Sequence, residues 1–153
     1  MKKKYLLLVI TVVILFFGCS KSNVNGSSTT WALKGTTYTA VNTDYYDSNS
    51  NLALLGGTDA KGNYINIYFN SHPTINGVFN LTTFDKLGYG NSKSDCAIIV
   101  GNNNSSYQYN STGKSGETVS VTFNDGKMRA TFNNITIEDA GDTTIVTGVL
   151  ILK

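Results

Sequence analysis

The sequence is poor in charge, proline, histidine and cysteine. Only 14% of its 153 residues are charged, against ~25% in an average soluble protein. One His and two Cys fall short of the four ligands of a structural zinc site. Lys and Arg number 12 against 10 Asp and Glu, so the basic excess of a nucleic-acid-binding protein is missing. Zinc proteins and nucleic-acid binders are therefore excluded at the outset.

Small polar residues take the place of the charged ones. The chain has 18 Asn, 19 Thr and 14 Ser, which together make up one third of it. Its hydrophobic content of 41% and aromatic content of 11% argue against disorder, which goes with low hydrophobicity and high net charge. Length and composition thus predict one folded domain with a real hydrophobic core.

The N-terminus has the pattern of an export signal. Lysines at 2–4 precede a thirteen-residue stretch, Tyr5–Phe17, in which only Thr11 is neither apolar nor aromatic. A membrane-spanning helix needs ~20 apolar residues, whereas the apolar region of a signal peptide has ~7–15. The stretch therefore predicts export rather than a transmembrane anchor.

Gly18 and Cys19 follow directly, and here the chain resembles a bacterial lipoprotein precursor. The resemblance implies cleavage before Cys19, a diacylglyceryl group on its thiol and further acylation, such as palmitate, on its new amine. Two or three acyl chains hold a protein on a membrane, where one is marginal. Phe16 and Phe17 depart from the usual Leu and small residue, so a plain secretory signal with an incidental Cys19 stays open.

These features divide the chain into three parts. Residues 1–18 are predicted to be a lipoprotein signal peptide, residues 19–30 a lipidated Cys and a flexible tether, and residues 31–153 a single β domain. Once the lysines at 2–4 leave with the signal, 9 basic and 10 acidic residues remain, a net charge of −1. We expect a protein of the bacterial cell envelope, held by its lipid on a membrane, the outer membrane in a bacterium that has one.

Lipidation of Cys19 leaves Cys96 without an intrachain disulfide partner. Cys96 lies in the strand-like run Asp95–Val100 and has no basic neighbour in sequence that would activate its thiol. We interpret it as a small buried hydrophobic residue.

The body of the chain has the pattern of short strands separated by turns. The clearest unit is Val119–Phe132, in which Asp125-Gly126 is a two-residue turn signal. A hairpin centred there pairs apolar with apolar and polar with polar residues at every rung, and a shift of one residue would destroy the match. Further strands are expected at 31–33, 37–41, 52–55, 64–69, 77–82, 97–100, 106–110 and 144–152. Eight to ten short strands predict an all-β antiparallel β-sandwich, with a closed up-and-down β-barrel as the alternative.

Several stretches of the mature chain are also similar to small uncharacterised lipoproteins of the Bacteroidota that carry a single β domain. They are WALKGTTY (31–38), GGTDAKGN (56–63), NGVFNL (76–81) and YNSTGKSGETVSVT (109–122). The resemblance implies a β fold and an envelope location. It carries no catalytic residue over to this chain.

No catalytic constellation is apparent in the sequence. There is no Gly-x-Ser-x-Gly elbow, and the one histidine, His72, precedes Pro73 in a turn-rich stretch. We therefore expect a protein that is not an enzyme, with no catalytic residue and no cofactor.

Two acidic segments contain residues that could bind calcium. Asp47, Asn49 and Asn51 alternate like the first ligands of a calcium loop, but Leu52 stands where Gly is required. Acidic residues at 138, 139 and 142 are expected in a second loop and lack a repeating spacing. Solvated loops are the better interpretation of both, and no metal residue is assigned.

Four tyrosines remain as candidates for ligand binding: Tyr64, Tyr68, Tyr107 and Tyr109. The Ile and Phe residues of 64–69 make a natural core face, which turns Tyr64 and Tyr68 outward. Tyr107 and Tyr109 share one face of another strand. Aromatic rings on a rigid sheet can stack on sugar rings while Asn and Asp bond the sugar hydroxyls. The alternative is that these tyrosines cover the second sheet face, with the ring packed and the hydroxyl in water.

The sequence thus favours a lipid-anchored binding module that contacts glycans through exposed tyrosines. The alternative is a structural or accessory envelope lipoprotein that binds a protein partner at an exposed strand edge.

Overall fold

The computed structural model describes residues 28–47, 52–88, 92–105 and 107–152. The predicted signal peptide, Cys19 and the tether up to residue 27 lie outside the described residues, as do Asn49 and Asn51 of the calcium-like pattern. In the described ranges, no helix is long and apolar enough to cross a membrane. Every strand and every core residue falls between Thr29 and Leu152, so a fragment that begins at Ser20 keeps the whole described domain.

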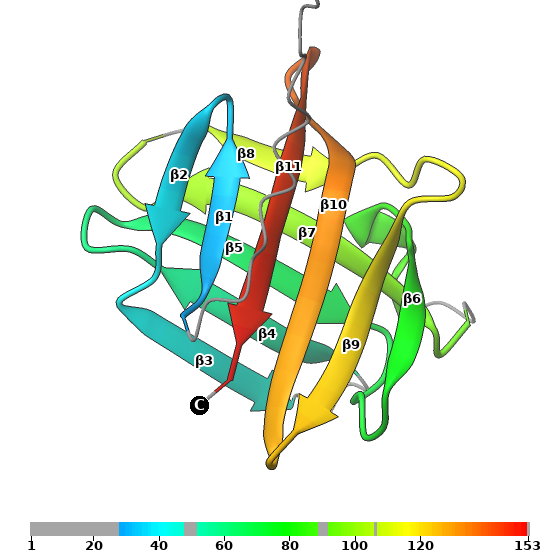
Figure 1. Cartoon of the computed structure of the whole chain (residues 1–153). Helices are drawn as coiled ribbons and strands as arrows, with labels where there is room; N and C mark the ends of the chain where they lie inside the picture. The colour runs from blue at the N-terminus through cyan, green and yellow to red at the C-terminus, as the bar shows by residue number, and fades with distance from the viewer. Residues whose placement is uncertain (1–27, 48–51, 89–91, 106, 153) are drawn as a thin grey trace, which may run out of the picture.

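Within the described ranges, eleven strands form two layers that face each other across the core (Figure 1). The front layer of that view consists, in spatial order, of β2 (Thr36–Thr39), β1 (Thr30–Leu33), β11 (Asp142–Ile151), β10 (Lys127–Asp139), β9 (Thr118–Asn124) and β6 (Gly77–Leu81). The back layer consists of β8 (Gln108–Ser111), β7 (Asp95–Asn102), β5 (Asn63–Phe69), β4 (Ala53–Thr58) and β3 (Asn42–Asp47). A single 3-10 turn, η1 (Phe84–Lys86), lies between β6 and β7 in the chain.

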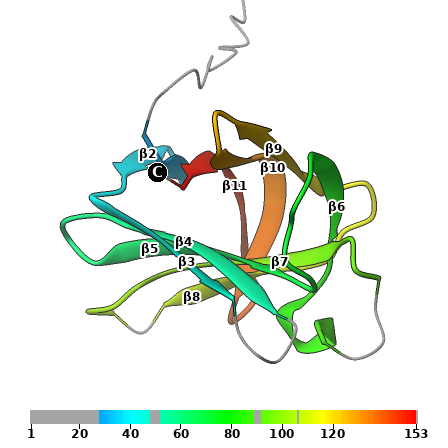
Figure 2. The same cartoon turned by 90° about the horizontal axis from the view of Figure 1, so that it is seen from below.

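The two layers are joined on one side of the molecule into a ring. Strand β8 pairs with both β7 and β10, and β6 pairs with both β7 and β9, so these five strands close on themselves. The remaining strands extend as two wings from the ring, and Figure 2 shows these wings lying one above the other. The all-β prediction is confirmed; the sheet combines a sandwich of two facing layers with a closed side. One pair, β6 with β7, is parallel rather than antiparallel.

The hairpin predicted around Asp125-Gly126 is confirmed rung by rung. Strands β9 and β10 pair Phe123 with Met128, Val121 with Ala130 and Val119 with Phe132. Asp125 and Gly126 have φ angles of 52° and 74°, the left-handed region that a type I′ turn requires at both central positions.

The last strand, β11, runs centrally in the front layer between β1 and β10. Its residue Gly148 pairs with Trp31 on one side and Phe132 on the other. A Cβ at position 148 would lie 2.7 Å from the Thr30 carbonyl oxygen and 2.8 Å from Cζ of Phe132. Position 148 therefore has close neighbours on both sides, and a register shift in β10 begins just after Phe132.

Thr29, just before β1, forms hydrogen bonds with the end of β11 and with β3. Its hydroxyl accepts a hydrogen bond from the Ile151 amide (2.8 Å) and one from the Thr43 hydroxyl (3.0 Å). Its methyl group lies against Gly57 of β4. Thr29 is 2% exposed, and Thr30 opens β1, so both residues, assigned to the tether from sequence, are part of the described β structure.

Asp47 and the acidic residues of a second segment, all expected in loops, lie in strands. Residues 42–47, which include the Tyr45-Tyr46 pair, form the edge strand β3, in which Thr43 and Tyr45 are half-buried while Asp44 and Tyr46 are exposed. Alternation of this kind is what one buried sheet face produces.

The second of these segments holds the acidic residues 138, 139 and 142. Glu138 and Asp139 end β10 and Asp142 begins β11, so only Ala140 and Gly141 remain as the turn. The loop expected around these carboxylates is replaced by a hairpin end.

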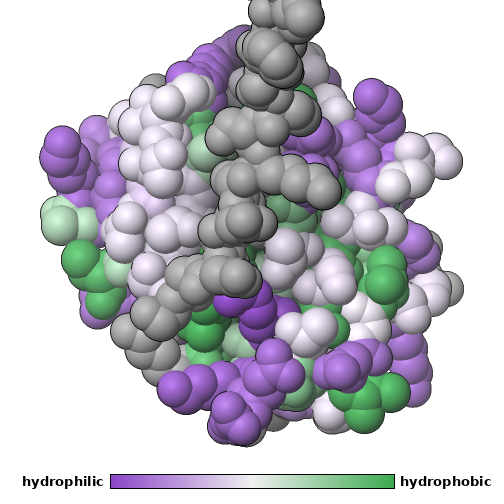
Figure 3. All heavy atoms as spheres, viewed as in Figure 1, coloured by the Kyte–Doolittle hydropathy of each residue, from purple (hydrophilic) through white to green (hydrophobic). Residues whose placement is uncertain are grey.

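The outer face of the front layer carries no large apolar patch in the part that is open to view. Figure 3 shows small hydrophobic groups separated by pale and hydrophilic residues over β1, β11, β10 and β9.

Candidate functional site

Strand register brings tyrosine and amide side chains together on the outer face of the back layer. On β5, Ile65, Ile67 and Phe69 are fully buried, so Tyr64, Asn66 and Tyr68 point outward, as the sequence predicts. Cross-strand pairing extends this face over the neighbouring strands in three rungs. They are Thr58–Tyr64–Gly101–Gln108, Gly56–Asn66–Ile99–Asn110 and Leu54–Tyr68–Ala97.

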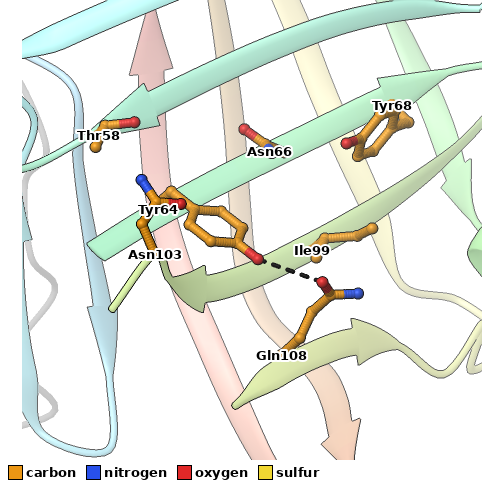
Figure 4. A pocket seen from close by; sticks show the side chains of 7 residues that line it. All are labelled: Thr58, Tyr64, Asn66, Tyr68, Ile99, Asn103 and Gln108. Carbon is orange, nitrogen blue, oxygen red and sulfur yellow. Dashed lines mark hydrogen bonds between the residues drawn. The ribbon is translucent and has the colours of Figure 1, made fainter. Parts of the chain in front are cut away.

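A shallow hollow of about 230 Å³ lies on this face. Figure 4 shows its seven lining side chains, with Tyr64 and Tyr68 at opposite ends of β5 and Asn66 between them. The lining is completed by Thr58, Asn103, Gln108 and Ile99. The hollow thus combines two phenol rings with three amides and one threonine hydroxyl, and none of its lining residues carries a charge.

Glycines on β4 and β7, the two strands beside β5, leave room for the side chains that line the hollow. A Cβ at position 101 would lie 2.5 Å from the Tyr64 hydroxyl and 3.0 Å from Cε1 of that ring, so the ring lies over the bare backbone of β7. On the other side, a Cβ at position 56 would lie 2.6 Å from Oδ1 of Asn66. Any larger residue at either position would displace a lining side chain.

Tyr64 is held across the sheet by a polar contact. Its hydroxyl donates to Oε1 of Gln108 at 3.3 Å (Figure 4). Burial, and then the neighbouring Tyr68, raise the pKa of the Tyr64 hydroxyl above its usual range. The group is therefore protonated at neutral pH and serves as a hydrogen-bond donor.

Tyr68 is fixed by a different contact. Its ring meets the ring of Phe84 edge to face, with centroids 4.7 Å apart. Phe84 belongs to η1 and is 40% exposed. Edge-to-face pairs of this kind contribute about 0.5–1.5 kcal/mol beyond area burial, which orients the Tyr68 ring without covering it.

The other two predicted tyrosines lie on the opposite face of the back layer. Tyr109 is 6% exposed and belongs to the core, and Tyr107 is half-buried against it, with the two rings 5.9 Å apart. The prediction that they share one face is right, but the prediction that this face is exposed is wrong. Gln108 and Asn110 take the outward positions of β8 because they pair with Gly101 and Ile99.

Tyr109 instead takes part in a polar cluster at the end of the molecule where two hairpins meet. Lys34, in the turn between β1 and β2, donates to the Tyr109 hydroxyl at 2.6 Å and to Asp142 at 2.5 Å. The Tyr109 hydroxyl donates to the same Asp142 carboxylate at 2.6 Å. The hydrogen bonds from Lys34, and then from Tyr109, hold the pKa of Asp142 below its usual range. The cluster joins β1, β8 and β11 and serves stability.

Neither a reactive thiol nor a metal cluster occurs in the described parts of the chain. Cys96 is fully buried, and burial raises its pKa far above the usual thiol range. His72 contacts Tyr45 and lies 3.4 Å from Asp47. No group of three or more His, Cys, Asp or Glu within the described ranges is placed to hold a metal ion.

Sequence reasoning missed the polar half of the hollow. Gln108, Asn103 and Thr58 line the hollow but are not among the predicted site residues. The Tyr-Gln-Tyr-Asn alternation of residues 107–110 contains the necessary signal. The amides are the solvent side of that pattern and the tyrosines the core side.

Comparison with known protein families, with curated proteins and with solved structures finds no match to this chain.

Proposed function

We propose that this chain is a lipid-anchored protein of the bacterial cell envelope that binds glycans, without enzymatic activity, at the hollow on the outer face of β4, β5 and β7. The observation that carries the proposal is the Tyr64 ring lying over Gly101 beside the amide of Gln108.

The chemistry of the lining fits a sugar. A ring laid against a sheet offers its free face, on which the C–H face of a pyranose can stack, and Tyr64 and Tyr68 provide two such rings. Sugar hydroxyls need both donors and acceptors, and the amides of Asn66, Asn103 and Gln108 supply both. A few convergent polar groups around an apolar surface are typical of sites that orient a small ligand.

The anchor is a separate part of the proposal and rests on Gly18-Cys19 after the apolar stretch. A protein carried on a membrane by lipid at Cys19 acts on ligands at that surface, where cell-envelope glycans are abundant. Anchoring and glycan binding can be tested independently.

The test is binding of the soluble fragment Ser20–Lys153 to a broad glycan array. We expect specific binding by the wild type and its loss in the Tyr64→Ala/Tyr68→Ala double variant. Tyr46→Ala is the matched control, because Tyr46 is 62% exposed on the same layer but does not line the hollow.

Three outcomes are decisive. Binding that is lost in the double variant and kept in Tyr46→Ala supports the proposal. Binding that survives in the double variant overturns the site. Absence of any glycan binding overturns the function and favours the alternative, a protein partner at the exposed edge of β2 or β3.

A further inference from the structure

A second hollow, of about 520 Å³, lies next to the first on the same side of the molecule. It is lined by Phe84 and Asp85 of η1, by Asn110 of β8, and by Glu138 and Asp139 at the end of β10, among others. The glycan site proposed above does not use it.

The two hollows are lined by different residues, but two pairs of these residues are in contact. On one side, Tyr68 lines the first hollow and Phe84 the second, and their rings are in contact at 4.7 Å. On the other side, Gln108 lines the first and Asn110 the second, and Nε2 of Gln108 donates to Oδ1 of Asn110 at 3.4 Å. An aromatic wall and an amide wall therefore continue from one hollow into the next.

The two hollows together form a track, from Tyr64 through Tyr68 to Phe84, that is longer than one sugar ring. Tyr64 and Tyr68 are four residues apart on one strand, which corresponds to about 13 Å at ~3.3 Å per residue. The Phe84 ring is in contact with Tyr68 and lines the second hollow. Three aromatic rings in sequence suit a chain of sugars rather than a single unit.

The charges around the two hollows favour neutral over acidic oligosaccharides. No Lys, Arg or His is among the lining residues of either hollow, and the second hollow presents three carboxylates, those of Asp85, Glu138 and Asp139. These carboxylates repel a uronate or a sulfate group, since like charges disfavour one another at short range. The track therefore disfavours acidic glycans.

From these observations we infer that the ligand is an uncharged oligosaccharide that occupies both hollows at once, stacked on Tyr64, Tyr68 and Phe84. The inference rests on the proposed glycan-binding function and specifies its substrate class.

The experiment is calorimetric titration of the Ser20–Lys153 fragment with one neutral oligosaccharide series, from monosaccharide to hexasaccharide, of the linkage that binds best on the array. We expect affinity to rise with length. Phe84→Ala is expected to weaken hexasaccharide binding about tenfold and monosaccharide binding clearly less, through the lost contact with Tyr68 alone. Tyr64→Ala is expected to weaken the binding of both ligands. Phe84→Leu, which keeps an apolar contact for Tyr68, separates lost stacking from a displaced Tyr68.

Failure of the inference differs from failure of the proposed function. If affinity is independent of oligosaccharide length, or if Phe84→Ala leaves the affinity for the hexasaccharide unchanged, the ligand does not occupy both hollows. Glycan binding at the first hollow would still stand. No binding by any member of the series or the array overturns both.

A second series tests the charge argument. Uronate-containing oligosaccharides of the same length are expected to bind at least tenfold more weakly at low salt, and Asp85→Asn is expected to reduce that difference. Equal affinity for the neutral and acidic series overturns the selection against charge.

Discussion

The Tyr64 ring lies over Gly101, with its hydroxyl 2.5 Å from the position that a Cβ of residue 101 would occupy. The absence of one side chain on β7 thus sets the position of a ring on β5, and the hollow depends on both. A glycine in a strand interior normally weakens the strand, unless it permits a close approach.

Gly101→Ala tests this dependence. The new methyl group must displace the Tyr64 ring, so we expect glycan binding to fall about tenfold, as in Tyr64→Ala. Stability should change by less than about 1 kcal/mol, because the displaced atoms are the far end of a side chain and Ala suits a strand better than Gly. The measurements are titration with the best array ligand and urea unfolding.

Gly77→Ala is the matched control, since a Cβ there would lie no closer than 3.5 Å to Phe79. Full ligand binding by Gly101→Ala would show that the position of the Tyr64 ring is not what the ligand requires.

Gly148→Ala is expected to lower stability, in contrast to Gly101→Ala. Here a Cβ would meet the Thr30 carbonyl oxygen at 2.7 Å and the Phe132 ring at 2.8 Å, inside the core of the front layer. Backbone cannot move aside as a side-chain end can, so we expect a loss of about 1–3 kcal/mol in the free energy of unfolding. Urea denaturation measures this loss, with Gly77→Ala again as the control. An unchanged unfolding midpoint would mean that β1 and β10 adjust freely around β11.

Much of the fold follows from sequence pattern, and the site follows only in part. The β9–β10 hairpin is predictable because a turn signal and matched rungs agree, and the outward direction of Tyr64 and Tyr68 follows from Ile65 and Ile67 between them. The direction of Tyr109 was predicted wrongly, although the alternation of residues 107–110 indicates it, because the amides of Gln108 and Asn110 mark the solvent side of β8.

The two hollows cannot be predicted from the sequence, because their lining residues lie far apart in the chain. Tyr64 and Gln108 are 44 positions apart, and only the pairing of β5 with β7 and of β7 with β8 brings them together. Strand β3 was not predicted because Asp47 was assigned to a solvated loop, although an edge strand tolerates charge on its open face.

Thr29→Val is expected to destabilise the domain through a single hydrogen-bonding group. The substitution keeps the side-chain volume but leaves the buried Ile151 amide without its acceptor. A buried unsatisfied donor costs about 1–3 kcal/mol, which urea unfolding of the Ser20–Lys153 fragment can measure. Thr29→Ser keeps the hydroxyl and loses only the methyl contact with Gly57, so it should cost less than Thr29→Val. The reverse order would assign the effect to packing.

Lipid attachment is predicted at Cys19. Cells that express the full chain and are fed an alkyne-bearing palmitate analogue should label the wild type and not Cys19→Ser, and the wild type should partition into detergent. Cys96→Ser is the control that should keep its label, since this buried thiol belongs to the folded domain. Label on Cys19→Ser would contradict the prediction and favour the plain secretory signal.

The Lys34–Asp142–Tyr109 cluster makes a pH-dependent contribution to stability whose sign can be derived. The hydrogen bonds from Lys34 and Tyr109 lower the pKa of Asp142 in the folded state, whereas in the unfolded chain it stays near ~3.9. A carboxylate whose folded pKa is lowered stabilises the fold above the unfolded pKa and loses that contribution as the pH falls through the folded value.

We therefore expect Asp142→Asn to lower the melting temperature at pH 7, and the difference from wild type to shrink below about pH 4. Lys34→Met should follow the same course, because it removes the first cause of the shift. Thermal unfolding between pH 2.5 and 7 provides the measurement. Asp44→Asn, at an exposed position on the edge strand β3, serves as the control whose difference from wild type stays small throughout. A difference for Asp142→Asn that stays constant across this range would show that the carboxylate acts through its shape and not through its charge.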